Sequence, residues 1–490
     1  MIPYKTIIQL DRKNKQPLYI QISNQIIALI KDHTLPPCSS LPSSRKLAEL
    51  LNVHRKTIIA CYDELNMQGW IETVPKKGTF VNAELPLFNS TQAPEKIRTK
   101  EKASFSFNKN PIFDIVPSSD SIQLTHLNEG VSDERLAPVE DLVKIYRSLI
   151  KKKTTLPYLS YHSTHGNPEL RETLAQYLNE TRGLTISKDN VLITRGSQMG
   201  IYLATQLLLN QDEYIIVGES NYLTADITFQ HSGAKILRVP IDQNGLNTKE
   251  IERLCKIYSI KAVYATPHHH HPTTVILSAK RRIHLLNLAQ TYRFAIIEDD
   301  YNYDFNYNHA PILPLATHDQ NSNVIYIGSV CKTVAPVFRV GYLIAAKEFV
   351  DECAQLRRYI DRQGDSILEL TFAHFIKNGD LDRHIRKILK IYKVRRDLFC
   401  SLLKKELNDY FEFDIPHGGM AVWVKLNNKY TWDKVAKIAS QNNLSIENAQ
   451  QYDIINKGHN GIRMGFASYT EEEIHEIIQK LKTTMNALKK

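Results

Sequence analysis

A lysine placed just behind an apolar run is the residue of this chain with the clearest potential for chemistry. Lys332 follows Ser329 in a turn of small residues, beyond the apolar stretch 324–327. Buried lysines are rare unless paired or functional, and desolvation lowers the lysine pKa until the amine is a usable nucleophile. A lysine that merely extends from a loop to solvent is the competing interpretation, and this residue alone leaves both open.

A second apolar run, 191–194, is followed by residues suited to a phosphate. Gly196, Ser197 and Gln198 open a segment with helical spacing. Backbone N–H groups at a helix start, with a hydroxyl beside them, bind phosphate well. A simple helix N-cap is the alternative, and on its own it is the more usual one.

An acid and two phenols follow two further runs. Asp299 comes after 294–297, with Tyr301 two residues on, and Tyr222 follows 214–218. The carboxylate can pair with a protonated ring nitrogen, Tyr301 with another ring substituent, and Tyr222 can cover a flat ligand. Acidic strand ends also bind magnesium, and Tyr222 serves equally well as a core residue.

Taken together, a phosphate cradle, an acid, a phenol, a stacking ring and an amine are the equipment for pyridoxal 5′-phosphate (PLP). In this interpretation Lys332 is the amine that bonds to the cofactor, and Asp299 pairs with its pyridine nitrogen. The set is far more specific than any of its members.

The segments that carry these residues alternate between two patterns. Short apolar runs predict strands, and segments such as 197–209 and 278–292 show helical spacing. This alternation predicts a large α/β domain with a mostly parallel sheet, whose ligands gather at the carboxyl ends of the strands. The predicted strands are 191–196, 214–219, 235–240, 261–266, 294–300, 324–329 and 341–346.

The first eighty residues have a different organisation. Apolar spacing predicts helices over 17–32, 43–51 and 54–70, followed by two short strands around residues 75–78. Three helices and a hairpin describe a small α+β winged helix-turn-helix, whose third helix would enter a DNA major groove. A small helical domain with solvated cations is the alternative.

Length and composition agree with a multidomain protein. A chain of 490 residues is too long to fold around a single hydrophobic core. The sequence separates into a DNA-binding domain (1–82), a linker (83–120) rich in Pro, Ser, Asn and Lys, and a large domain (121–490). Of the net charge of +10, the first domain holds +5, from 11 Lys and Arg against 6 Asp and Glu. That excess suits a polyanionic partner without proving one.

The chain is expected to be cytoplasmic. Neither a signal peptide nor a run of eighteen apolar residues is evident, so no membrane span is predicted. The six scattered cysteines form no CxxC pair, which favours free thiols in a reducing compartment.

The N-terminal motifs resemble the GntR-type winged helix. The matching stretches are "PLYIQISNQI", "LPSSRKLAELLNVHRKTI", "YDELNMQGWIE" and "KKGTFV", which together cover nearly all of 12–82. Where many relatives have a glycine before Leu-Pro-Ser, this chain has "PCSS", and that loop is expected to differ. The resemblance implies DNA contact by Arg45, His54, Arg55, Lys56, Thr57 and Gly78.

Residues 125 to 485 resemble fold-type I, PLP-dependent aminotransferases. The matching stretches include "YHSTHGNPELRETLAQYLNETRG", "ITRGSQMGIYLATQLLL", "IIEDDYNYDF", "GSVCKTVAPVFRVGY" and "GIRMGFAS". A GntR-type winged helix fused to such a domain is the layout of the MocR-like transcription regulators.

The resemblance implies a role for each matching residue. Lys332 would form the internal aldimine, and Arg463 would hold the α-carboxylate of an amino-acid ligand. Asp299, Tyr301 and Tyr222 keep the roles given above. The residues that match the surroundings of the phosphate are Gly196, Ser197, Gln198, Ser329 and Arg339.

Three departures from the family pattern affect the ligand. The usual Pro-Thr-Gly is "HPTT" here, with Thr274 in place of the glycine, and His271 stands where aminotransferases have an asparagine that touches the 3′-oxygen. No arginine follows Tyr222 closely, so a second carboxylate clamp is not expected there. A metal site in His268 to His271 is not expected either, because neighbouring residues rarely converge on one ion.

Two functions are compatible with these residues. In the first, a regulator bound to double-stranded operator DNA responds to the cofactor, or to a small amine or amino acid that forms an external aldimine with it. In the second, the large domain is a working aminotransferase under the control of the winged helix. The fusion favours the regulator, and both resemblances imply a homodimer, in which each DNA-binding arm can lie on the partner's large domain.

Overall fold

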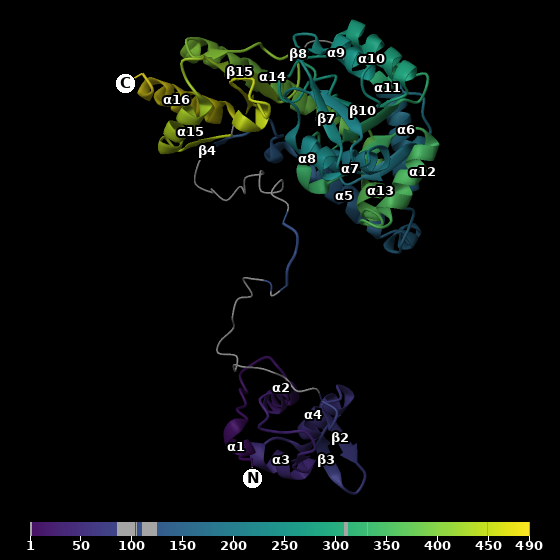
Figure 1. Cartoon of the computed structure of the whole chain (residues 1–490), viewed down its shortest axis with the longest axis vertical. Helices are drawn as coiled ribbons and strands as arrows, with labels where there is room; N and C mark the ends of the chain where they lie inside the picture. Colours follow the sequence, from purple (N-terminus) through teal and green to yellow (C-terminus); the bar gives the residue numbers. More distant parts are fainter. Residues whose placement is uncertain are drawn as a thin grey trace. The chain divides into compact units, whose positions relative to one another are not determined.

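A computed structural model of the chain describes residues 2–85, 103, 105–109, 125–307, 312–330, 332–447 and 449–489. Two compact units are present, Met1–Lys109 and Asn110–Lys490 (Figure 1). Most of the predicted linker, 83–120, lies outside the described residues.

The small unit is a winged helix. Its apolar core takes Ile22 and Ile26 from α2, Leu47 from α3 and Ile58 from α4. β3 lies between β1 and β2 in a three-stranded antiparallel sheet. The elements are α1 (Tyr4–Ile7), α2 (Leu18–Lys31), β1 (Ser40–Leu41), α3 (Ser44–Leu51), α4 (Arg55–Met67), β2 (Ile71–Val74) and β3 (Gly78–Val81).

Local sequence explains the turn between α3 and α4. Ser43 caps α3 by accepting a hydrogen bond from the Lys46 N–H at 3.3 Å, and Asn52 ends the helix in the left-handed conformation, which asparagine tolerates well. His54 then caps α4 through its ring. The three predicted helices and the hairpin are confirmed, but α4 ends at Met67 and not at residue 70, because Gly69 takes a φ of +76°. α1 and β1 are additions that their short length hid from the sequence.

A seven-stranded sheet organises the large unit, and it is mostly parallel as predicted. β13 is the exception, since it pairs antiparallel with both β12 and β5. The chain returns directly from β12 to β13, and such a short connection cannot make a parallel crossover. In spatial order the strands are β5 (Val191–Thr194), β13 (Gly341–Ile344), β12 (Val324–Ser329), β11 (Ala295–Asp300), β10 (Ile260–Ala265), β6 (Tyr214–Gly218) and β7 (Lys235–Val239).

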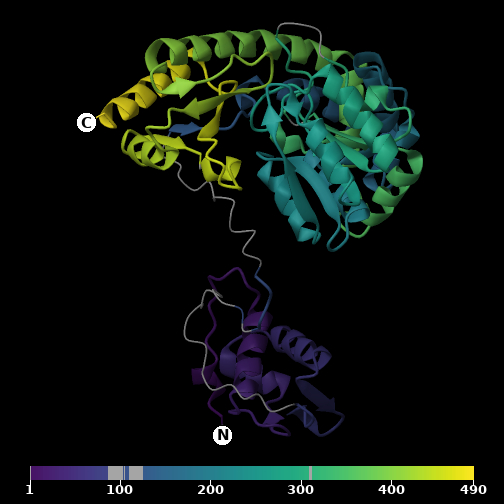
Figure 2. The same cartoon turned by 45° about the horizontal axis from the view of Figure 1, so that its top comes forward.

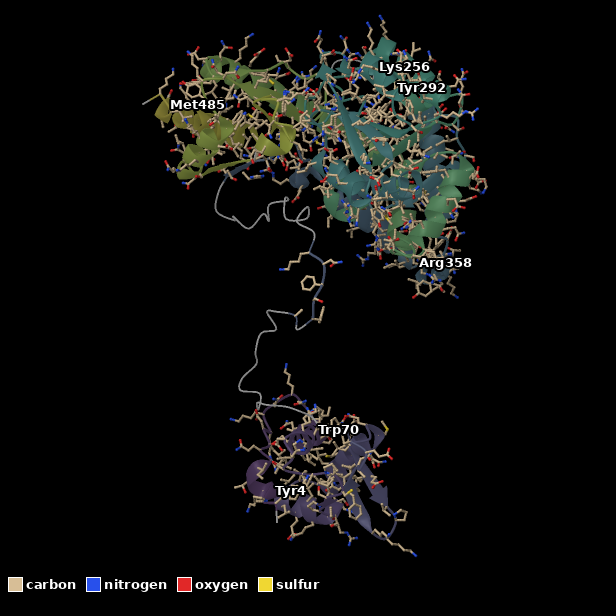
Figure 3. All side chains as sticks on the ribbon, in the orientation of Figure 1. Tyr4, Trp70, Lys256, Tyr292, Arg358 and Met485 are labelled. Atoms are coloured by element: carbon tan, nitrogen blue, oxygen red, sulfur yellow. The ribbon has the colours of Figure 1, made fainter. Side chains whose placement is uncertain are left out.

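Helices cover both faces of this sheet (Figures 1 and 3). One apolar core packs α7 (Ser197–Leu208), α8 (Leu223–His231) and α12 (Lys347–Arg357) against it. Figure 3 labels Lys256 and Tyr292 at the ends of two helices of the opposite layer, α9 and α10. The opposite layer consists of α5 (Val139–Ile150), α6 (Pro168–Arg182), α9 (Thr248–Cys255), α10 (Ala279–Tyr292) and α13 (Ser366–Lys377).

The C-terminal part of the large unit has a core of its own. Here β15 lies between β14 and β17, and β4 pairs with β16 from the far end of the chain. The long helix α14 (Asp380–Leu407) supplies Leu381 to the sheet core and Phe399 to the C-terminal core, and Figure 2 shows it spanning the two parts. The elements are β4 (Thr125–Leu127), β14 (Phe411–Glu412), β15 (Ala421–Leu426), α15 (Trp432–Gln441), β16 (Leu444–Ile446), β17 (Gly461–Gly465) and α16 (Glu471–Ala487).

Short elements complete the large unit. They are α11 (Leu315–His318) and the pair β8 (Ile241–Asp242) and β9 (Gly245–Leu246). None of the described helices combines the length and apolar character that crossing a membrane would need.

Candidate functional site

The residues predicted from the strand ends come from one edge of the seven-stranded sheet. β6, β10, β11 and β12 are parallel, and two antiparallel pairings through β13 bring β5 into the same direction. Their carboxyl ends therefore share an edge, where ligands of open α/β sheets bind. β13 runs the other way, so Arg339, just before its first residue, belongs to that edge as well.

Lys332 lies between β12 and the short 3-10 helix η5 (Pro336–Phe338) and is half-buried. Its Nζ is 4.5 Å from the centre of the Tyr301 ring. The carbonyl of the following residue, Thr333, accepts a hydrogen bond from Nε2 of His384 on α14 at 2.8 Å. The turn that carries the amine is thereby anchored to the helix that spans both parts of the unit.

Asp299, at the end of β11, has one carboxylate oxygen in a hydrogen bond and the other without a partner among the described residues. The Tyr264 hydroxyl donates to Oδ2 at 2.7 Å, while Oδ1 is buried without a hydrogen-bond partner among the described residues. Burial raises the pKa of Asp299 to about 6, although the Tyr264 bond and the charge of Lys332 oppose this. An orphaned carboxylate oxygen of this kind suits the N–H of a protonated ring nitrogen.

Gly196 and Arg339 form a cradle at the start of α7. Gly196 has a φ of +76°, and a Cβ placed there would lie 2.9 Å from Nη2 of Arg339. That nitrogen also donates to the Arg195 carbonyl at 2.9 Å. The guanidinium thus lies beside the first turn of α7, which begins at Ser197, and the pair suits a phosphate.

Two other residues predicted near the phosphate have protein partners. The Gln198 side-chain amide donates to the Thr228 hydroxyl at 2.8 Å, and the Ser329 hydroxyl donates to the Val340 carbonyl at 3.2 Å. Within the described part of the chain, the Gln198 Oε1 is buried and has no partner. The strongest phosphate donors of the predicted set are therefore Arg339 and the N–H groups of α7.

His271 lies among the aromatic residues of the site. Its ring is 5.4 Å from that of Tyr222 and 6.3 Å from that of Tyr301, centre to centre. Burial lowers its pKa, and its Nδ1 has no hydrogen-bond partner in the ranges described. A neutral imidazole with one open nitrogen can donate to or accept from a ring oxygen.

The neighbouring histidines turn to different partners. His268 pairs with Asp300 at 3.1 Å, and His270 contacts the Thr273 hydroxyl at 2.9 Å. Over the described ranges, no group of three or more His, Cys, Asp or Glu side chains could hold a metal ion.

Arg463 on β17 is 1% exposed and fixed from two sides. Its Nε donates to the Glu129 carbonyl at 2.6 Å, and its Nη1 donates to the Pro272 carbonyl at 3.2 Å. Burial raises the pKa of Tyr301 to about 12, while the nearby charge of Arg463 acts to lower it. The arginine therefore lies on the Tyr301 side of the site.

Three residues of the site were missed in the sequence. Glu129 pairs with His271 at 3.4 Å, Tyr452 donates to Glu129 at 3.1 Å, and Tyr264 binds Asp299. Each comes from a segment distant in sequence from its partner. No regular spacing in the sequence connects these residues. The only usable signal is for Tyr264, which lies on β10, the strand that pairs with the strand of Asp299.

The DNA-contact residues predicted for the small unit lie at its surface. His54, Arg55 and Lys56 are exposed at the start of α4, and Arg45 is exposed on α3. The Arg55 Nε donates to the Ser44 hydroxyl at 3.4 Å. The further predicted residues are Thr57, which is half-buried, and Gly78, which is exposed with a φ of +124°.

Comparison with known families identifies the architecture. The model of the class I and II aminotransferases matches residues 125–481, and the model of the bacterial regulatory proteins of the gntR family matches residues 18–81. The chain belongs to the class I and II aminotransferase family, with a gntR-family domain at its N-terminus. It is a MocR-like protein. The predicted resemblance and the predicted fold class are both confirmed.

Relatives extend over nearly the whole MocR-like chain. It is 28% identical over 475 residues to the HTH-type transcriptional regulator YdfD of Bacillus subtilis, covering 96% of each chain. It is also 22% identical to the probable rhizopine catabolism regulatory protein MocR of Rhizobium meliloti, covering 98% of this chain and 96% of the relative.

A solved structure matches the large unit. The kynurenine aminotransferase of Pyrococcus horikoshii, crystallised in complex with PMP, superimposes with a TM-score of 0.72 and 26% identity. The match covers 78% of this chain and 98% of the aminotransferase. The large unit of the MocR-like chain thus has a complete aminotransferase fold.

Proposed function

We propose that this MocR-like chain is a transcription regulator that binds operator DNA through its small unit and PLP through its large unit. A small amine or amino acid bound beside the cofactor would be the effector. The observation that carries the proposal is the presence, in one chain, of exposed cations at the start of α4 and of an amine, an orphaned carboxylate and a phosphate cradle around one sheet edge.

The residues around that edge fit the cofactor. Asp299 Oδ1, which has no hydrogen-bond partner among the described residues, is an acceptor for the ring N–H, Arg339 and the α7 N–H groups suit the phosphate, and Tyr222 can cover the ring. Tyr301 and His271 would contact the ring oxygen. When bound, PLP supplies an aldehyde that bonds to amines and a ring that withdraws electrons.

The protein's own groups then divide the work between binding and proton transfer. Lys332 would hold the cofactor through its amine and, when that amine is free, would accept or donate a proton. Asp299 would pair with the protonated ring nitrogen, and Arg463 would orient a ligand carboxylate. Because the Thr333 carbonyl is hydrogen-bonded to His384, a change in the position of Lys332 would shift the contact with α14.

A homodimer is part of the proposal. Among the apolar side chains of the large unit, several near the 3-10 helix η3 (Lys153–Leu159) are more than half exposed, and Tyr161 there packs against Arg362 at 4.1 Å. An apolar surface of this kind favours self-association. Sedimentation velocity on the full chain tests this, and a monomer at micromolar concentration would contradict it. The exposed residues are Leu156, Leu159, Tyr161 and Tyr359.

A titration tests the regulatory function. The full-length holoprotein would be mixed with a panel of amino acids and amines while cofactor absorbance and binding to the DNA upstream of its own gene are followed together. We expect one ligand class to shift both signals over the same concentration range, and Lys332→Ala to abolish both shifts. A ligand that changes the absorbance without changing DNA affinity would contradict the proposal.

A working aminotransferase is the second candidate, because Lys332, Asp299 and Arg463 lie around one site and the large unit matches a complete aminotransferase. Formation of a keto acid from the same ligands distinguishes the two. Sustained turnover without an effect on DNA binding would favour the enzyme.

A further inference from the structure

Glu129, which the sequence did not single out, is bound into the candidate site by three residues. Its Oε2 accepts a hydrogen bond from the Tyr452 hydroxyl at 3.1 Å and lies 3.4 Å from Nε2 of His271. Its main-chain oxygen accepts from Nε of Arg463 at 2.6 Å. The carboxylate is therefore fixed beside both the histidine and the arginine of the site.

The carboxylate is charged and can be reached by a ligand. Burial alone would raise the pKa of Glu129, but the bond to His271 and the charges of Lys332 and Arg463 outweigh this and lower it. The side chain nevertheless remains 40% exposed. A negative charge thus stands at an open position next to the two cations that an amino-acid ligand would meet.

The other charged residue close to Glu129 in the sequence is engaged elsewhere. His126, three residues before it, pairs with Glu447 at 3.0 Å. Among the described residues, Glu129 is the carboxylate whose electrostatic partners include both Lys332 and Arg463.

This arrangement discriminates between ligands by charge. A ligand whose α-carboxylate lies on Arg463 directs its remaining groups past a fixed anion. A second carboxylate would be repelled, whereas a cationic group would be attracted, and both effects are strong in a partly buried site. The bonds to Tyr452 and His271 keep Glu129 from turning away.

We propose that Glu129 selects the effector of this site, favouring an amino acid with a cationic side chain over a dicarboxylic one. The inference rests on the proposed function, since it takes the effector to bind beside Arg463 and the cofactor. A purely positional role, in which Glu129 only orients His271, is the alternative that an experiment must separate.

The test uses full-length protein loaded with PLP and three amino acids of comparable size. Cofactor absorbance is followed during titration with L-ornithine, L-glutamine and L-glutamate, for the wild type, Glu129→Gln and Glu129→Ala. Glu447→Gln is the matched control, because it removes a carboxylate that also pairs with a histidine, His126 at 3.0 Å.

We expect the wild type to bind L-ornithine at least about tenfold more tightly than L-glutamate, as one charge pair in a partly buried site provides. Glu129→Gln and Glu129→Ala should both reduce this ratio about tenfold, with L-glutamine little affected, and Glu447→Gln should leave it unchanged.

Two results would overturn the inference. One is a wild type that binds L-ornithine no more tightly than L-glutamate. The other is an equal loss of affinity for all three ligands in the Glu129 variants, which is the outcome of a purely positional role. A wild type without cofactor absorbance would instead remove the proposed function, so the two failures are distinguishable.

Discussion

In the small unit the cations at the start of α4 lie in water with few contacts, whereas the polar groups of the large unit are buried and held from several sides. Arg55 donates to Ser44 at 3.4 Å from an exposed position, while Arg463 is 1% exposed and bound to two carbonyls. Exposed, adaptable cations suit a polyanion whose charge is continuous. Fixed and desolvated groups suit a small molecule that must be recognised atom by atom.

Charge alone therefore does not locate a ligand site. The small unit carries an excess of basic residues. In the site of the large unit, positive and negative side chains balance, and the charge of Lys332 acts to lower the pKa of both Asp299 and Glu129, as that of Arg463 does for Glu129. Changes to the large unit should therefore be felt in stability and cofactor binding, and changes to the small unit in DNA binding alone.

The largest effect is expected for Asp299→Asn in protein stripped of cofactor. Because burial raises the pKa of Asp299 to about 6, the folded state binds the proton more strongly than the unfolded state. The wild type should lose stability as pH rises from about 4 to 6, and the variant should be about 3 kcal/mol more stable above that range.

Urea unfolding of the large unit at several pH values measures this. Asp351→Asn is the control. Lys347 lowers the pKa of that surface carboxylate, so this substitution should reduce the stability at neutral pH and not increase it. Equal stability of the wild type and Asp299→Asn at pH 7 would contradict this, because it would show that the ionised Asp299 does not lower the free energy of unfolding.

Arg339→Ala should weaken cofactor binding. The guanidinium beside Gly196 is the strongest phosphate donor of the predicted set, and a bond to a charged group contributes about 1.5–3 kcal/mol, or roughly 10- to 150-fold in affinity. Absorbance titration of the apo protein with PLP measures the change. Arg195→Ala, which removes the neighbouring side chain but keeps the carbonyl that Arg339 binds, should have little effect. The same affinity in Arg339→Ala and the wild type would place the phosphate elsewhere.

Arg55→Ala should weaken operator binding by about 1–3 kcal/mol if it contacts a base edge, or by less if it contacts a phosphate. Its cofactor absorbance should match that of the wild type, because the residue belongs to the other unit. Fluorescence anisotropy with labelled operator provides the affinity. Unchanged binding across a salt titration would show that the start of α4 does not enter the groove.

The smallest effect is expected for Lys56→Ala. Replacing one phosphate contact should lower the slope of log affinity against log salt by about 1 and weaken specific and non-specific DNA equally. Lys31→Ala, at the end of α2, is the control of equal charge. An equal slope in Lys56→Ala and the wild type would exclude Lys56 from the contact.

The sequence predicted what local patterns determine. Runs such as 294–300 and 324–329 predicted the central strands β11 and β12. The residues that follow such runs, which are proposed as the amine, the acid and the phosphate cradle, come from one edge of the sheet. Contacts between residues far apart in the sequence could not be predicted. Glu129, His271 and Tyr452 meet only in the folded chain, and no regular spacing connects them. β1 was missed for another reason, since two residues carry no periodicity.

The central claim, that Lys332 is the amine that holds PLP, has a direct test. Full-length holoprotein would be reduced with borohydride, digested and analysed by mass spectrometry. The structure predicts a phosphopyridoxyl group on the peptide that contains Lys332, and none on that peptide in Lys332→Ala. A label on another lysine, or an unlabelled wild type, would contradict it.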